Sequence, residues 1–373
     1  QAGLFSMAFT VGTLLLFLAN YGVRTYQVSD LDDMRSFLDY QINRFVTCAA
    51  MLLVGWMWCQ FRGYDAYMFS ICMGVLVFRA VDGLADVYEG RLQQKDKLYL
   101  AGLSQAARCV LGLVAFSLVL FVTRSLALAS FGMAVGAVAS LVLLTVPLAY
   151  FETERSMPAT ARGIRELFVE CFPLFLALFL YNLIDSVPKF AMEGALSYDN
   201  QLYYNAMYFP AHSILMVAGF IYKPQLVRLA RIWDDPEKHR RFDLLVLAMV
   251  GVIALVTGAM ALVMGTVGIP LMSFMYGLDF ERFRGLCLVM VATGGVCACI
   301  DFLYQIVTVL RAQGDVSKLY LIAFAFSVPV AMLLVNFAGL AGAVVGSLVS
   351  MAILLTLLVM EYFGIRKRMS RGD

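Results

Sequence analysis

Charged side chains lie inside the long apolar stretches of this chain, where they could bind an ion or a polar solute. A charge at the centre of a lipid-spanning helix costs roughly 2.5–3.5 kcal/mol, so such a residue normally faces a partner or a water-filled cavity. The embedded charges are Arg79, Asp82, Asp86, Glu89, Arg108, Asp185, Lys189, Lys223 and Asp301. Their presence favours a transport pathway over a passive membrane anchor.

The spacing of these residues indicates which of them can pair within one helix. Arg79, Asp82, Asp86, Glu89 and Gln93 follow a 3-4-3-4 pattern, which places them on one face of a helix as a polar stripe. Arg79 can pair with Asp82, and the Asp185–Lys189 pair, one turn apart, can likewise neutralise itself. We expect Glu89 to lie at the water interface, where it needs no special role.

Arg108 has no acidic residue within a turn or two of its own segment, so its partner must come from another helix, lipid or substrate. An arginine guanidinium matches phosphate oxygens bidentately and stays charged in any environment. We therefore predict a cationic cavity for an anionic substrate, lined by Arg24, Arg79, Arg108, Lys189 and Lys223. The alternatives are internal ion pairs and, for Arg108 and Lys223, long side chains that reach back to the membrane surface.

Three acidic residues are candidates for ion or proton coupling: Asp82, Asp185 and Asp301. A helix–helix hydrogen bond is the alternative role for each. The sequence contains no Gly-x-x-x-x-Gly-Lys-Ser/Thr phosphate loop, so the chain is not itself expected to hydrolyse ATP. No His/Asp/Glu constellation looks catalytic and no Cys or His spacing suggests zinc. We therefore expect neither an enzyme nor a bound cofactor or metal.

The elements that must position these residues are membrane-spanning helices. Of the 373 residues, 62% are hydrophobic and only 14% are charged, and the mean hydropathy is +0.82. Uncharged runs of about 20 residues identify spans. The sequence predicts an all-α polytopic membrane protein with spans at 1–20, 45–61, 65–90, 98–123, 125–149, 167–188, 202–226, 243–267, 286–309, 318–337 and 340–362.

The distribution of basic residues predicts the orientation. Most of the 28 Lys and Arg residues fall in the loops that follow the odd-numbered spans. The opposite side carries Arg62, Arg124, Lys189, Arg282 and Arg284. Because cytoplasmic loops are enriched in basic residues, we expect a multi-pass protein of the cytoplasmic membrane with a cytoplasmic C-terminus. The chain opens at Gln1 directly in an apolar helix, and we expect that one helix precedes it, which would make twelve.

An internal echo suggests two related halves. Residues 91–100 (RLQQKDKLYL) and 311–321 (RAQGDVSKLYL) each follow a long span and lie six spans apart. Chance similarity is the alternative. We predict two six-helix lobes related by a pseudo-two-fold, with residues 1–150 forming the N-terminal lobe and residues 151–373 the C-terminal lobe.

Three stretches resemble the multidrug/oligosaccharidyl-lipid/polysaccharide exporter superfamily, and above all its Wzx-type polysaccharide flippases. They are 20–29 (NYGVRTYQVS); 185–190 (DSVPKF) with 203–210 (YYNAMYFP) and 223–226 (KPQL); and 275–280 (MYGLDF). The resemblance covers essentially the whole chain, although its motifs are loose. The missing first helix is a departure, because that helix normally lines the cavity.

The resemblance implies export of polyprenyl-pyrophosphate-linked oligosaccharide units by alternating access, for surface polysaccharides such as O-antigen or capsule. The partners would be that lipid-linked oligosaccharide, membrane lipids and other polysaccharide-assembly proteins, with no nucleic acid. A multidrug or cation antiporter of the same superfamily is the alternative, since Asp82 and Asp301 could serve an organic cation. A major-facilitator transporter or an integral membrane enzyme of polysaccharide assembly fits less well.

Overall fold

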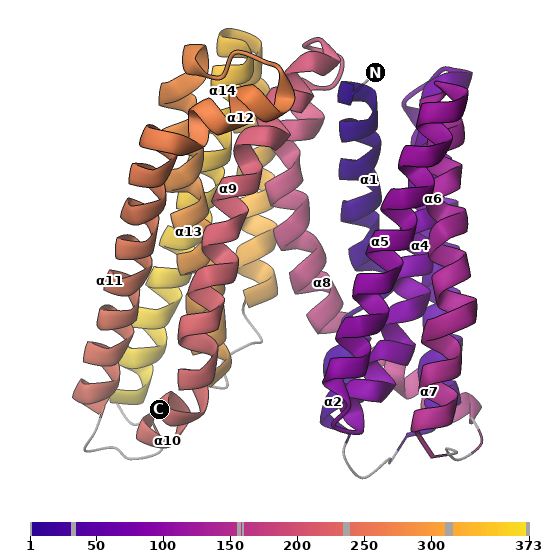
Figure 1. The fold of residues 1–373 in the computed structure, drawn as a ribbon. Coiled ribbons are helices and arrows are strands. Elements are labelled where there is room, and N and C mark those ends of the chain that lie inside the picture. The colour runs from indigo at the N-terminus through magenta and orange to yellow at the C-terminus, as the bar shows by residue number, and fades with distance from the viewer. Residues whose placement is uncertain are drawn as a thin grey trace. The chain divides into compact units, whose positions relative to one another are not determined.

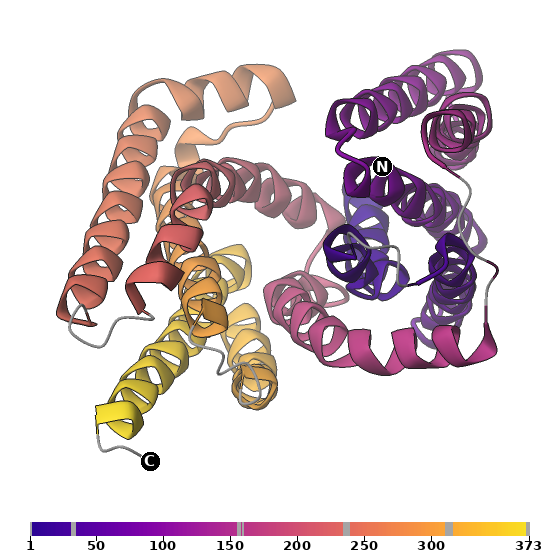
Figure 2. The same ribbon diagram turned by 90° about the horizontal axis from the view of Figure 1, so that it is seen from below.

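The structure is a computed structural model that describes residues 2–30, 35–154, 158, 160–233, 239–309 and 316–370. Within these residues the chain is helical and contains no β-strand. It divides into two compact units, Gln1–Asn182 (unit 1) and Leu183–Asp373 (unit 2). The helices of each unit are shown from two directions (Figures 1 and 2). The boundary falls inside helix α8 (Ala161–Met192), whereas the lobe boundary predicted at 150/151 precedes that helix.

Two helices of unit 1, α3 and α4, begin at capping residues that can be recognised in the sequence. Ser36 caps α3 by accepting a hydrogen bond from the Leu38 amide, and the Asp39 carboxylate accepts one from the Ser36 amide. Asp65 caps α4 by accepting a hydrogen bond from the Met68 amide. The helices are α1 (Ala2–Asn20), α2 (Val23–Ser29), α3 (Phe37–Phe61), α4 (Ala66–Gln94), α5 (Leu98–Thr123), α6 (Leu126–Ser140) and α7 (Val146–Glu152), followed by the first part of α8.

Helix α4 lies at the centre of unit 1, because α1, α2, α3, α5, α6 and α7 all pack against it. Small side chains allow this close packing: a Cβ atom on Gly74 of α4 would lie 2.6 Å from Ser130 Cβ of α6. A helix surrounded on all sides can present its polar face only to other helices. The polar stripe (Arg79, Asp82, Asp86, Glu89 and Gln93) is therefore positioned to meet several neighbours at once.

Unit 2 is arranged around α13 (Arg284–Val309), which packs against α9 (Tyr198–Tyr222), α11 (His239–Val263) and α14 (Val316–Ser370). The remaining helices are α10 (Leu226–Trp233) and α12 (Ile269–Tyr276). Helix α14 breaks at Gly339, whose backbone has φ 57° and ψ −130°. Short π-helical turns precede Pro147 and Pro270, each of which lacks the N–H that a regular helix would use.

The helices agree with the spans predicted from the sequence. Nine helices of the described residues are long and apolar enough to cross a membrane. One of them, α14, breaks at Gly339 between the predicted spans 318–337 and 340–362. The predicted span 202–226 overlaps α9, which is not among the nine. The chain is thus an all-α, multi-pass membrane protein. Residues 311–315 of the internal echo lie outside the described residues.

Candidate functional site

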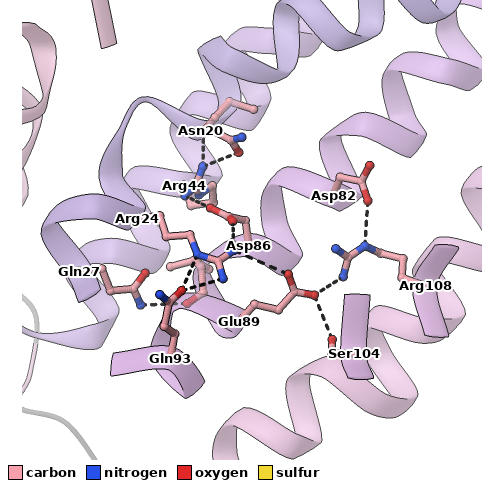
Figure 3. Close-up of polar contacts among 12 residues, drawn as sticks. Asn20, Arg24, Gln27, Arg44, Asp82, Asp86, Glu89, Gln93, Ser104 and Arg108 are labelled. Atoms are coloured by element: carbon pink, nitrogen blue, oxygen red, sulfur yellow. Dashed lines mark hydrogen bonds and ion pairs between the residues drawn. The ribbon is translucent and has the colours of Figure 1, made fainter. Parts of the chain in front are cut away.

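The polar stripe of α4 faces arginines from three neighbouring helices (Figure 3). Arg108 of α5 lies on one side, and Arg24 of α2 and Arg44 of α3 lie on the other. The spacing of the residues predicts the stripe on α4, and the packing of α2, α3 and α5 against it supplies the arginine partners. We call the four arginines 24, 44, 79 and 108, with Asp82, Asp86 and Glu89, the charge network.

Arg108 is held by two carboxylates of α4. Its Nε donates to Asp82 Oδ1 at 2.8 Å, and its Nη1 donates to Glu89 Oε1 at 2.6 Å. The side chains of Arg108 and Glu89 are only 3% and 2% exposed. Ser104, one turn before Arg108 on α5, donates a further 3.0 Å hydrogen bond to Glu89. The partner of Arg108 is therefore another helix, and the expectation that Glu89 lies at the water interface is wrong.

Asp86 accepts from two arginines of different exposure. Arg24 Nη1 lies 2.5 Å from Asp86 Oδ1, and Arg44 Nη2 lies 2.7 Å from Asp86 Oδ2. Arg44 is fully buried and also donates to the Ala19 carbonyl and to Asn20. Arg24 is 32% exposed and donates to Gln93 Oε1 from Nε and Nη2. Arg24 is thus the most accessible arginine of the charge network.

Arg79 forms the pair within α4 that its spacing predicts. Its Nη1 donates to Asp82 Oδ2 at 3.0 Å, and its Nη2 donates to the Thr13 hydroxyl of α1 at 3.0 Å. The guanidinium carbon lies 4.3 Å from the centroid of the Phe9 ring, a favourable cation–π geometry. Asp82 is thus shared between Arg79 and Arg108. The charge network as a whole contains four cationic and three anionic side chains.

In unit 2, Asp185 and Lys189 form the predicted pair on α8. Lys189 Nζ donates to Asp185 Oδ2 across 3.4 Å, and both residues are 7% exposed. The Tyr208 hydroxyl of α9 donates to the same carboxylate oxygen at 2.8 Å. The Tyr208 ring centroid lies 4.1 Å from Lys189 Nζ. Aromatic contact with Tyr208 adds to the self-pairing that the sequence suggested.

The two remaining predicted site residues lie elsewhere in unit 2. Lys223 begins the short helical turn Lys223–Gln225 after α9, and its side chain is exposed. Asp301 of α13 accepts a hydrogen bond from the Tyr222 hydroxyl at the end of α9. Of the five predicted cavity cations, the structure brings together Arg24, Arg79 and Arg108 in unit 1. In the part of the chain that the structure describes, no group of three or more His, Cys, Asp or Glu residues is arranged to hold a metal ion.

Comparison with known proteins shows the fold. No protein-family model and no curated protein sequence matches the chain. Solved structures match it over nearly its whole length. An inward-facing multidrug resistance MATE family transporter of the MOP superfamily has a TM-score of 0.65 at 13% identity, covering 98% of this chain and 88% of the other.

Two further structures agree with that match. The Vibrio cholerae MATE transporter VcmN in its bent form has a TM-score of 0.62 at 14% identity, covering 98% of this chain and 87% of the other. A MOP superfamily transporter from Pyrococcus furiosus, described as having a binding pocket of reverse polarity, has a TM-score of 0.60 at 12% identity, covering 99% and 85%. The chain therefore has the two-lobed fold of the MATE transporters.

Proposed function

We propose that this protein is a secondary transporter that moves an amphipathic solute across the membrane by alternating access. The observation that carries the proposal is the likeness over essentially the whole chain to MATE transporters. Matching structures include an inward-facing and an outward-facing form, with TM-scores of 0.65 and 0.59. A fold that adopts both forms suits a carrier that exposes its site to each side of the membrane in turn.

The charge network supports transport over a purely structural role for unit 1. Seven charged side chains meet on and around α4, a helix long and apolar enough to cross a membrane, and a charge in lipid without its partner would cost a few kcal/mol. Replacing buried ion pairs by apolar residues of similar volume is often neutral or stabilising, so stability alone does not call for such a network. In the proposed transporter these charges would line a water-filled pathway next to Arg24, whose side chain is 32% exposed.

The first candidate substrate is an organic cation or drug, exported in exchange for an inward-moving ion. It is favoured by the fold, because two of the matched structures are multidrug resistance MATE transporters. Aromatic rings beside a carboxylate suit a cation, and Tyr208 with Asp185 in unit 2 provides that combination. In this structure Lys189 occupies that position, and in unit 1 Asp82, Asp86 and Glu89 each pair with arginine, so an organic cation would have to displace a basic side chain at either place.

The second candidate is a polyprenyl-pyrophosphate-linked oligosaccharide. The charge network favours it, since four arginines face three carboxylates and leave one excess positive charge. The exposed edge of Arg24 could exchange its Gln93 contacts for phosphate oxygens. The Pyrococcus furiosus structure with a pocket of reverse polarity supports the idea that this fold serves substrates of either charge.

A pair of assays separates the two candidates. The protein is expressed in bacteria that lack their own drug exporters, where ethidium accumulation is measured, and in bacteria that lack their own O-antigen flippase, where surface glycan is measured. Reduced ethidium accumulation supports the first candidate, and restored surface glycan supports the second. Neither effect, from protein that is folded and inserted in the membrane, would overturn both.

A further inference from the structure

The short helix α10 meets two longer helices at one end of unit 2. Its last residue, Trp233, stacks on His239 at the start of α11, with 4.4 Å between ring centroids. The guanidinium carbon of Arg366, near the end of α14, lies 5.2 Å from the centroid of the Trp233 ring. Figure 1 shows α10 at the end of unit 2 where α11 begins. The start of α11 and the end of α14 therefore lie side by side.

Both of these helix ends are ends of candidate membrane spans. One span begins at His239 and the other finishes at Lys367. Because Trp233 contacts both helix ends, positions 239 and 367 mark the same boundary of the hydrocarbon layer. Lipid headgroups lie at that boundary, and tryptophan is enriched there. Side chains at these positions are thus placed to meet headgroups.

Two arginines in the first turn of α11 lack an acidic partner. Arg240 and Arg241 are both exposed, and neither forms an ion pair with a described residue. The first turn of α11 contains no Asp or Glu, although the positive end of a helix dipole favours an acidic side chain there. The nearby Asp243 carboxylate is already taken, since it accepts from Arg366 and from the Tyr362 hydroxyl. Positive charge therefore collects at the start of α11 without a counter-charge.

The sequence of this end of unit 2 has the same sign. Residues 223–243 and 361–373 together contain ten Lys and Arg against six Asp and Glu. Three of the six acidic residues fall in 234–238, which lie outside the described residues. Even with all six ionised, this end carries a net positive charge and attracts an anion.

Apolar side chains continue along α11 from the two arginines. Leu244 and Leu247, one and two turns beyond Arg240, are 59% and 67% exposed. Only 11% of the most apolar part of this span is buried within the protein, so in a membrane its surface contacts lipid tails. An occupant that meets both the arginines and the leucines needs an anionic head and an acyl chain. An inorganic anion fits only the first of these.

We infer that the start of α11 binds an anionic phospholipid, with its phosphate on Arg240 and Arg241 and an acyl chain along Leu244 and Leu247. A guanidinium offers two parallel N–H groups to phosphate oxygens. A zwitterionic lipid brings its own cation to the headgroup, whereas phosphatidylglycerol does not, so the site prefers the anionic lipid. Lys367, exposed at the end of α14, extends the cationic surface. This binding goes beyond the proposed transport function and needs no transported solute.

The test uses Trp233 as a reporter, because the chain contains only two other tryptophans. The full chain carrying Trp56→Phe and Trp58→Phe is reconstituted in phosphatidylcholine vesicles that contain brominated phosphatidylglycerol or, at the same mole fraction, brominated phosphatidylcholine. Bromine quenches the fluorescence of a nearby indole. We expect the anionic lipid to bind about fivefold more tightly or better, since one basic side chain beside an anionic lipid surface contributes about that factor. In Arg240→Gln with Arg241→Gln the ratio should fall toward one.

The matched control is Arg62→Gln with Arg282→Gln, which removes the same charge from two exposed positions outside this end of unit 2 and should keep the ratio. Equal quenching by the two lipids before any arginine is changed would overturn the site. A preference that survives Arg240→Gln with Arg241→Gln would also overturn it, as would an equal fall in the control, which would indicate attraction by overall charge. Melting temperatures of all variants ensure that only folded protein is compared.

Discussion

Arg108 Nη1 of α5 lies 2.6 Å from Glu89 Oε1 of α4, and both side chains are buried. Asp82 accepts a second hydrogen bond from the same guanidinium. Arg108 therefore joins two helices by donating to two carboxylates, one of which it shares with Arg79, and it is less available to a substrate than its isolated place in the sequence suggested.

This relationship predicts a large loss of stability in Arg108→Met. The change leaves Glu89 buried without its cation, and breaking a buried pair in this manner costs about 3–5 kcal/mol. The measurement is the unfolding free energy of purified protein in detergent. The control is Arg162→Met, since Arg162 forms an ion pair with Glu166 on the surface and is 90% exposed. No measurable change is expected there, and equal losses in the two variants would contradict the account.

Arg24 and Arg44 both pair with Asp86. Substituting each in turn should distinguish an effect on transport from an effect on stability. Arg24→Gln is expected to cost less than Arg44→Gln, because Arg24 is 32% exposed and Asp86 keeps its contact with Arg44, yet to reduce transport. Arg44→Gln is expected to cost about 3 kcal/mol or more, because Arg44 is fully buried. Thermal unfolding and the two cellular assays measure the two effects. Full transport by Arg24→Gln would remove Arg24 from the pathway.

Close packing of α4 on α6 predicts a third result. In Gly74→Ala the new Cβ would meet Ser130 Cβ at 2.6 Å and the Ser130 carbonyl carbon at 2.9 Å. Overpacking of this kind costs typically 1–3 kcal/mol. Gly102→Ala on α5 is the matched control, since nothing lies within 4 Å of its Cβ position, and it should be neutral or slightly stabilising. The melting temperature of Gly74→Ala should therefore be lower than that of Gly102→Ala.

The backbone at Gly339 gives a fourth prediction. Its φ of 57° with ψ −130° is a conformation that only glycine adopts readily. Gly339→Ala should therefore lose about 1–3 kcal/mol of unfolding free energy. Hydrogen exchange should rise locally on both sides of residue 339. Unchanged stability and exchange would show that α14 does not need this break.

The sequence predicts most of the helices because hydrophobic length is a local property. It even separates the two parts of α14 at 337 and 340, beside Gly339. It does not predict α2 (Val23–Ser29), because that helix lies in a polar connection where no apolar run marks it. Helix α3 begins at Phe37 rather than 45, since its first turns carry polar residues that the fold buries, Asp39 and Arg44 among them.

Only part of the charge network can be predicted from the sequence, because helical periodicity is local whereas contacts between helices are not. Helical periodicity places Asp82, Asp86 and Glu89 on one face, but it does not say which helices that face meets. The predicted span 45–61 leaves Arg44 in the preceding loop, whereas Arg44 is fully buried against Asp86. Its place in the helical pattern after the Ser36 cap was the available signal. Pairing across helices depends on tertiary packing, which one sequence does not reveal.

The central claim, alternating access, is tested most directly by distances between spin labels on the two units. One pair joins Arg62→Cys with Arg282→Cys, at ends that the sequence predicts to be external, and the other joins Arg162→Cys with Arg240→Cys, at predicted internal ends. All four positions are exposed, and the labelled variants are made with the native cysteines replaced. The account predicts two populations for each pair, with the external distance lengthening when the internal distance shortens. A single unchanged distance for both pairs, at every pH and with every solute tried, would contradict it.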